Sequence, residues 1–257
     1  MKNGDIVFVR QDHLREFNEK VATRLNQKIV IVSGFRDHSL SQFENTVTEL
    51  LNNPNIQHWF STNCDIDHPK LTGIPIGLNY HQMSLSFAKL SLDIDTPQEP
   101  FEFERFIKST VDKMKLFSKI DGIFTNANIN MNGNRLKDFQ IIGNNQSLSG
   151  KLYLQDKFLM RKQSLRLMSC FRYVLSPSGN GHDCFRTWEA LLLGCIPIVK
   201  KTGIEKVFEG LPVIQVDSWD DDIKLSNWSK HDPNNLRLTM DYWWGIISKE
   251  KQKILPS

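Results

Sequence analysis

The sequence predicts an α/β protein made of two small units, each a parallel sheet covered by helices. Three observations favour this fold class. Short apolar runs rich in β-branched residues alternate with segments whose apolar residues recur at helical spacing. The alternation occurs twice, on either side of a charged region that contains Pro97 and Pro100. The length of 257 residues suits one large or two small domains.

The first unit starts with two strand-like runs, DIVFV at residues 5–9 and KIVIVSGF at residues 28–35. The segment between them predicts a helix, because its apolar residues lie three or four positions apart. The residues of this apolar stripe are Leu14, Phe17, Val21 and Leu25. A second helix is predicted in SQFENTVTELLNN, and IQHWFSTN and LTGIPIGL predict two further strands.

The second unit follows a connecting region and a helix predicted from Glu102 to Phe117. DGIFTNANIN and FRYVLSPSG predict strands, and YLQDKFLMRKQSLRLMSC between them predicts mostly helix. IPIVK and PVIQVDSW predict two more strands, with a helix in GIEKVFEG between them and a helical tail to about Lys251. We therefore expect one domain over residues 1–100 and a second over residues 101–257.

The composition excludes several classes of protein. The net charge is +3 and the basic residues form no long run, so we expect no nucleic-acid partner. No window approaches 18 apolar residues, and the apolar run near the N-terminus is too short for a signal peptide. We expect a soluble cytoplasmic protein whose contact with a membrane, if any, is peripheral. The cysteines form no CxxC pair and are expected to be free thiols: Cys64, Cys170, Cys184 and Cys195.

One stretch carries the chemistry, SPSGNGHDCFRTWEALLLGCIPIVK at residues 176–200. It predicts a loop after a buried strand, then a helix from Cys184 to about Leu193 that Asp183 caps and Gly194 ends. In open parallel sheets ligands bind outside the carboxyl ends of strands, where this loop lies. Its glycines let a ligand approach the backbone, and a helix N-terminus suits phosphate.

Arg186 and Glu189 lie on one face of the predicted helix. The arginine suits bidentate pairing with a pyrophosphate, and the glutamate suits two ribose hydroxyls. An ion pair on a solvated helix face is the alternative, which the apolar neighbours disfavour. A second phosphate ligand is expected at Arg135, for which a surface arginine is the alternative. The residues expected to contact a nucleoside diphosphate in this stretch are Ser176, Ser178, Gly179, Asn180, Gly181, Asp183, Arg186, Thr187 and Glu189.

The motif GxGxDxxRxWEALxxGCIPI in this stretch resembles the carboxyl-terminal region of exostosin-like glycosyltransferases, in the branch found in fungi, algae and large DNA viruses. WFSTNCDIDHPKLTGIPIGL is similar to an upstream motif of such proteins. The resemblance implies a GT-B fold, in which two Rossmann-like domains face a cleft. It implies an enzyme with a nucleotide-sugar donor, expected to be a UDP-sugar, on the second domain. A glycan or glycoprotein acceptor is expected mainly on the first domain, with inversion at the anomeric carbon and no metal or other cofactor.

Inverting transfer needs a base for the acceptor hydroxyl and positive charge for the departing diphosphate. Arg186 is expected to supply the charge. Asp37, directly after a predicted strand, is the preferred base. The alternative bases are Asp65, Asp67 and His68, and each acid is also a common turn or cap residue. The run Asp220–Asp222 contains a DxD, which we interpret as a helix cap rather than a metal site.

Two other function classes compete with a transferase. A non-catalytic nucleotide-sugar-binding or scaffold protein of the same fold would keep Arg186 and Glu189 but show no turnover. A doubly wound phosphoryl transferase would carry GxxxxGK[ST], which is absent from the sequence. A dinucleotide enzyme would carry GxGxxG directly after its first strand, and that motif is absent too.

Overall fold

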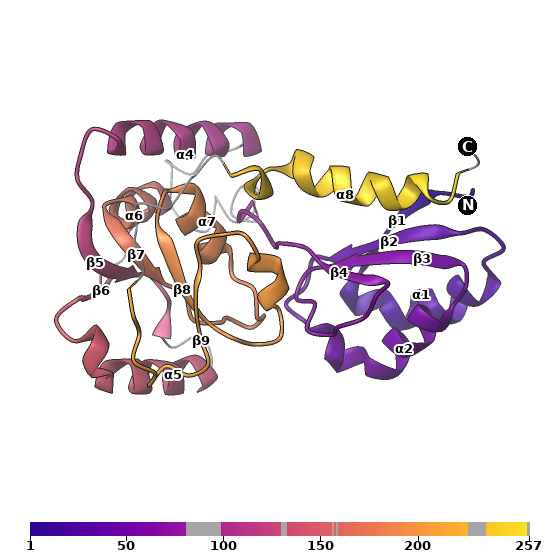
Figure 1. Cartoon of the computed structure of the whole chain (residues 1–257), viewed down its shortest axis with the longest axis horizontal. Helices are drawn as coiled ribbons and strands as arrows, with labels where there is room; N and C mark the ends of the chain where they lie inside the picture. Colours follow the sequence, from indigo (N-terminus) through magenta and orange to yellow (C-terminus); the bar gives the residue numbers. More distant parts are fainter. Residues whose placement is uncertain (81–98, 130–132, 156, 158, 226–234, 256–257) are drawn as a thin grey trace.

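Two parallel sheets lie side by side, each with helices on both faces (Figure 1). This arrangement confirms the predicted fold class, α/β with two small parallel-sheet units. The predicted boundary after residue 100 falls between the two sheets and otherwise stays a prediction. The computed structural model describes residues 1–80, 99–129, 133–155, 157, 159–225 and 235–255.

The first sheet has the order β1-β2-β3-β4 with every pair of neighbours parallel. Its strands are Asp5–Arg10, Ile29–Gly34, Ile56–Ser61 and Leu71–Gly73. One face is covered by α1 (Leu14–Lys20) and α2 (Glu44–Asn52). The apolar stripes predicted for these helices form a core with every second residue of the strands. Successive side chains of a strand point to opposite faces of the sheet, so only alternate residues face these helices.

The opposite face of the first sheet is covered by the last helix, α8 (Met240–Gln252). Ile247 of α8 is buried against Val30 and Phe60 of the sheet. The chain therefore leaves the second unit and returns to the first, so that both termini lie at the far end of the first unit (Figure 1).

The second sheet has the order β6-β5-β7-β8-β9, again with parallel neighbours. In chain order its strands β5 to β9 are Ile120–Thr125, Leu152–Leu154, Phe171–Leu175, Ile196–Lys200 and Ile214–Val216. One face packs on α4 (Pro100–Met114), α6 (Arg161–Ser169) and α7 (Phe185–Leu192). The other face packs on α5 (Gly133–Asn144).

Several predicted helices are shorter than expected. The segment predicted as mostly helix, residues 153–170, begins within a strand, β6, because Leu152–Leu154 pairs with β5, and the helix α6 starts only at Arg161. GIEKVFEG forms a single 3-10 turn, η7 (Glu205–Phe208), rather than an α-helix. The helix predicted to end near Phe117 is α4 and ends at Met114. Within the described ranges, every helix is too short or too polar to cross a bilayer.

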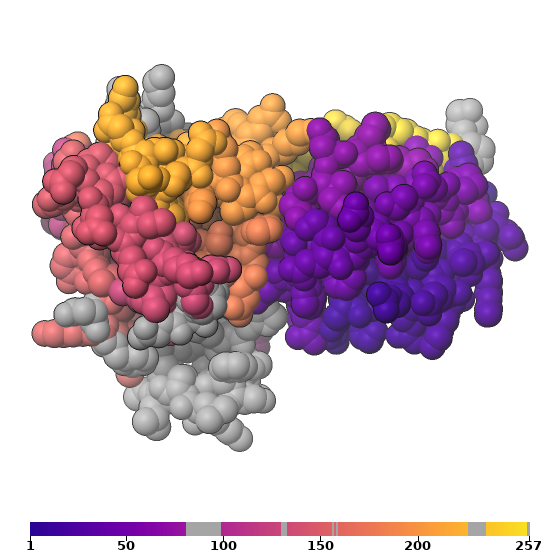
Figure 2. Space-filling view, turned by 90° about the horizontal axis from the view of Figure 1, so that it is seen from below, coloured from indigo at the N-terminus to yellow at the C-terminus, as the bar shows by residue number. Residues whose placement is uncertain are grey.

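The two units meet at the carboxyl ends of their strands. Figure 2 shows them in contact over a long boundary. The loop after β7 in the second unit touches the loops after β2 and β3 in the first, and Asp183 Nα donates to Asn63 Oδ1 over 2.8 Å. Ligands bind at the carboxyl ends of parallel strands in such sheets, so this junction is the candidate position for a functional site.

Candidate functional site

The helix that follows the glycine-rich loop begins at Phe185, and its N-cap position is Cys184. The predicted cap by Asp183 is wrong. The Asp183 carboxylate instead accepts hydrogen bonds from Trp188 Nε1, at 2.8 and 3.0 Å, and from the Ile76 backbone N–H, at 2.8 Å. The side chain therefore joins α7 to the segment after β4 of the first unit. The predicted end of the helix is confirmed, since Gly194 follows it with φ of 74°.

Burial raises the pKa of Asp183 to about 6, while the hydrogen bonds from Ile76 and Trp188 act in the opposite direction. The carboxylate is ionised at neutral pH but buried in the contact between the units. This residue is therefore a charged group at the junction, held by the Trp188 side chain and by the backbone N–H groups of Ile76 and Cys184.

Gly181 faces the first unit. A methyl group on it would lie 3.1 Å from both Asn63 side-chain ends and 3.1 Å from the Asp37 carbonyl oxygen. Asn63 itself has a positive φ of 49°, a conformation that asparagine tolerates better than most residues. A side chain at Gly181 would thus crowd Asn63 and Asp37 across the contact between the units, and the approach of a ligand to this glycine stays a prediction.

Arg186 lies in the first turn of α7, as predicted, and its side chain points toward the end of β5. Its Nε donates to Asn126 Oδ1 over 2.6 Å. Its Nη1 is buried and has no hydrogen-bond partner among the described residues. Burial lowers the pKa of Arg186, and the nearby charge of Arg135 adds to the effect. An arginine still keeps its proton, so the site holds a half-buried cation whose Nη1 donor is buried and unused.

Arg135, on α5, is buried with 3% of its surface exposed, so the alternative of a surface arginine is wrong. Its Nε donates to the carbonyl of Ser178 over 2.9 Å, and its Nη2 donates to the carbonyl of Pro177 over 3.4 Å. The guanidinium therefore holds the glycine-rich loop in place. A direct contact with phosphate stays a prediction for this residue.

Glu189 is buried and its Oε1 accepts from Arg161 Nη2 over 2.5 Å. Arg161, the first residue of α6, also donates to the Asn79 carbonyl and lies over the Phe103 ring, 4.6 Å from its centroid. The structure thus supplies a cationic partner for the carboxylate on a neighbouring helix. The ion pair on a solvated face of α7 is ruled out, and the ribose role of Glu189 stays a prediction.

The other predicted residues of the stretch form the frame of the loop. Ser176 Oγ and Thr187 Oγ1 are buried 2.9 Å apart, which ties α7 to the end of β7. Gly179 donates its backbone N–H to the Gly181 carbonyl over 3.1 Å, and Asn180 is exposed at the tip. Ser178 supplies the carbonyl that Arg135 binds. Contacts of these residues with a ligand stay predictions.

The four candidate bases differ in what their side chains do. Asp65 accepts from Ser41 N and Ser41 Oγ, at 3.0 and 2.5 Å. Asp67 pairs with Lys206 over 2.6 Å, and His68 Nδ1 accepts from the Lys70 backbone. Asp37 is exposed, and its carboxylate has no hydrogen bond to the described residues.

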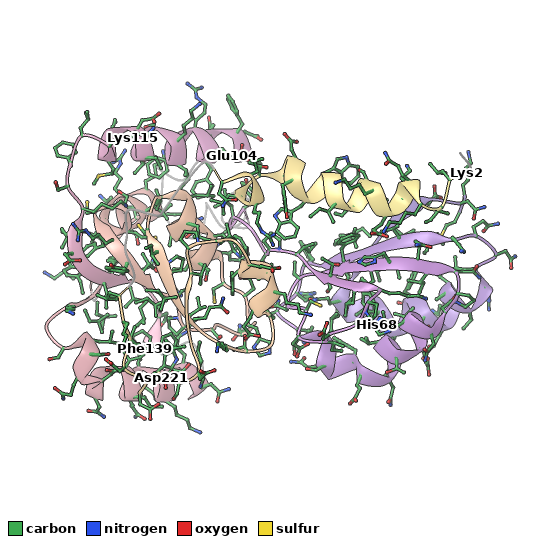
Figure 3. The ribbon with its side chains drawn as sticks, viewed as in Figure 1. Lys2, His68, Glu104, Lys115, Phe139 and Asp221 are labelled. Atoms are coloured by element: carbon green, nitrogen blue, oxygen red, sulfur yellow. The ribbon has the colours of Figure 1, made fainter. Side chains whose placement is uncertain are left out.

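No group of three or more histidine, cysteine or acidic residues in the described ranges could hold a metal ion. The cap predicted at Asp220–Asp222 is wrong, since no helix starts between Asp220 and residue 225. Asp221 instead closes a turn by accepting from the backbones of Asp217 and Ser218, and it lies beside α5 (Figure 3). The four cysteines are free thiols, as expected.

No protein-family model matches the chain, and no curated protein matches it. Among solved structures the chain is similar to apo OtsA, with 11% identity over 99% of this chain and 74% of that chain and a TM-score of 0.46. It is also similar to a glycosyltransferase from Rickettsia africae (13% identity, 97% and 69% coverage, TM-score 0.37). A third similarity is to WaaG, a glycosyltransferase involved in lipopolysaccharide biosynthesis (12% identity, 95% and 75% coverage, TM-score 0.32). The fold assignment rests on the two parallel sheets, and the exostosin-like resemblance stays a prediction.

Three residues of the site were missed from the sequence: Asn63, Asn126 and Arg161. The two asparagines follow strands β3 and β5, a position that could have drawn attention to them, because polar residues at the carboxyl ends of parallel strands meet at one edge. Arg161 carries no such signal. Its pairing with Glu189 joins α6 to α7 through two residues that are 28 positions apart along the chain.

Proposed function

We propose that the protein transfers a sugar from a nucleoside diphosphate sugar, with UDP as the nucleotide, to a hydroxyl of a glycan or glycoprotein acceptor. Transfer inverts the anomeric carbon and needs no metal ion. Two features support this proposal. The loop with the exostosin-like motif lies at the junction of two parallel-sheet units, and a cluster of arginines surrounds it.

The observation that carries the proposal is the unpaired donor of Arg186. A buried donor without a partner costs about 1–3 kcal/mol, more when it is charged. Its neighbour Arg135 is also cationic, so the cost includes repulsion between like charges. A diphosphate beside Nη1 and the N-terminus of α7 would remove both costs, because it supplies acceptors and negative charge.

The reaction follows from this placement. The acceptor oxygen attacks the anomeric carbon as the bond from that carbon to the diphosphate oxygen breaks, and the bonding electrons leave with the diphosphate. The acceptor proton passes to the Asp37 carboxylate, whose loop contacts the glycine-rich loop. Arg186 stabilises the charge that grows on the leaving diphosphate. Glu189, held by Arg161, accepts the ribose hydroxyls.

The experiment is a thermal-shift screen of the whole chain against UDP, GDP, CMP and dTDP, followed by a transfer assay with UDP-sugars. A ligand that binds the native state raises the melting temperature. We expect UDP to give the largest shift. The proposal fails if no nucleotide shifts the melting temperature. Binding of UDP with no turnover on any acceptor would instead favour the non-catalytic nucleotide-sugar-binding protein.

A further inference from the structure

A cavity lies between the two units, under the first turns of α8. Its volume is about 500 Å³, within the range of about 300–1,000 Å³ of small-molecule sites. The first unit contributes residues after β3 and in β4, and the second contributes η7 and Asp183. The helix α8, which packs on the first sheet, completes the lining. None of the arginines near the glycine-rich loop, Arg135, Arg161 and Arg186, lines it. The cavity is therefore distinct from the proposed donor site and adjoins it through Asp183.

The charges of the lining select against an anion. Its cationic side chains are Lys206 and Arg237, and its carboxylates are Asp67, Asp183, Glu205 and Glu209. Lys206 is neutralised by Asp67, which crosses from the first unit over 2.6 Å. A second phosphate or an acidic sugar would meet the remaining carboxylates, so repulsion would oppose its binding.

The remaining lining combines aromatic, apolar and hydrogen-bonding groups. The Arg237 guanidinium lies over the Tyr242 and Trp243 rings, 5.2 and 5.5 Å from their centroids, and its Nη1 donates to the Tyr242 hydroxyl. Its Nε is buried and has no acceptor within the part of the chain that the structure describes. Ile74 and Ile204 complete an apolar wall. Donors, carboxylate acceptors and aromatic rings together match a neutral polyhydroxyl ligand, whose hydroxyls both donate and accept and whose C–H faces pack on apolar surface.

We infer that this cavity binds one neutral sugar residue of the acceptor. That the sugar belongs to an acceptor rests on the proposed function. That the cavity binds a neutral sugar rests on the cavity alone. It assigns part of acceptor binding to η7 of the second unit and to α8, which packs on the first sheet, whereas the family resemblance places the acceptor mainly on the first domain. Asp183 then lies between the two substrates, with its carboxylate at the acceptor cavity and its backbone in the donor loop.

Gly73 offers a way to fill the cavity. It lines the cavity at the end of β4, and a Cβ on it would meet only Cys64 Cβ within 4 Å, at an ordinary 3.4 Å. Its backbone is not in the left-handed region, so a larger residue is not strained there. Gly143 on α5 is the matched control, because a Cβ on it meets nothing within 4 Å and it lies outside the cavity lining.

The test uses saturation-transfer NMR with the methyl glycosides of glucose, galactose, mannose and N-acetylglucosamine, and with methyl glucuronide as the anionic probe. At least one neutral glycoside should bind the wild type, and Gly73→Leu should weaken it about tenfold or more while Gly143→Leu leaves it unchanged. UDP affinity, measured by calorimetry, should be equal in all three proteins. Gly73→Val replaces the leucine variant if melting shows that the latter does not fold.

The inference is overturned if no neutral glycoside binds at millimolar concentration, if Gly73→Leu binds it as the wild type does, or if methyl glucuronide binds better. Failure of the donor proposal gives a different result from failure of this inference. UDP then does not bind the wild type, whereas the glycoside still binds and its binding is still weakened by Gly73→Leu.

Discussion

Replacement of Arg186 by methionine separates the phosphate contribution to donor binding from the nucleoside contribution. Methionine keeps much of the aliphatic length of the side chain and removes the guanidinium. A hydrogen bond from a charged donor contributes about 1.5–3 kcal/mol, so loss of the Nη1 contact should weaken UDP about ten- to a hundredfold. Uridine lacks the phosphates, and its affinity should change by less than about twofold.

The structure also predicts the effect on the unliganded protein. Arg186→Met loses the bond to Asn126, which comes from a charged donor and is worth about 1.5–3 kcal/mol. It also removes a cation with a buried, unpaired donor, which costs about as much. The free energy of unfolding should therefore stay within about 1 kcal/mol of the wild type. The combination of weaker UDP and unchanged stability distinguishes a ligand contact from a structural residue.

The assay is calorimetry with UDP and NMR titration with uridine, with melting curves recorded on the same samples. Arg15→Met is the control, because Arg15 is an exposed arginine on α1 and its loss changes the net charge equally. Equal losses for UDP and uridine, or UDP affinity unchanged in Arg186→Met, would refute the placement of the diphosphate at α7. A large fall in stability would show that Arg186 is a core residue instead.

The other predictions concern the junction, the ribose, the metal and the last helix. The pKa of Asp183 is raised from 3.8 to about 6, so its protonated form is favoured by folding and its contribution to stability is lost as pH rises through 6. Relative to Asp183→Asn, the wild type should therefore gain up to about 3 kcal/mol between pH 7 and pH 4, measured by urea unfolding; a difference that does not vary with pH contradicts this. Glu189→Gln should weaken UDP and uridine alike and cost about 1–3 kcal/mol of stability, because Arg161 loses its anionic partner; weakening of UDP alone would exclude the ribose role. Treatment with EDTA should leave transfer unchanged, and activity that is lost and then restored by manganese would disprove metal independence. Ile247→Ala should destabilise the protein by about 2–5 kcal/mol in urea unfolding, with Ser248→Ala as the near-neutral control.

Much of the fold followed from the sequence because periodicity reports burial locally. The strand-like runs of the first unit are β1 and β2, and the apolar stripe starting at Leu14 covers the sheet as expected. One error arose where a contact between distant residues decided the outcome. Asp183 has the sequence context of a helix cap, but its carboxylate instead accepts from Trp188 of its own unit and from Ile76 of the other unit. No local rule predicts that choice.

The candidate site was predictable to the same degree. The positions of Arg186 and Glu189 on one helix follow from spacing, and the burial of Glu189 follows from its apolar neighbours. The partners do not follow, because Asn126 and Arg161 reach them from β5 and α6. Likewise, the contacts of Arg135 could not be predicted, because nothing in its own segment shows that it lies within hydrogen-bonding distance of the carbonyls after β7.

The return of α8 onto the first sheet affects how this chain can fold during synthesis. Until α8 emerges from the ribosome, the apolar surface around Val30 and Phe60 has no cover, although α1 and α2 are already in place on the other face. The first unit is then a two-layer intermediate with an exposed hydrophobic face, the kind of species that chaperones bind. A fragment that stops before Thr239 should remain in that state, so cutting the chain between the sheets would not yield two independent proteins.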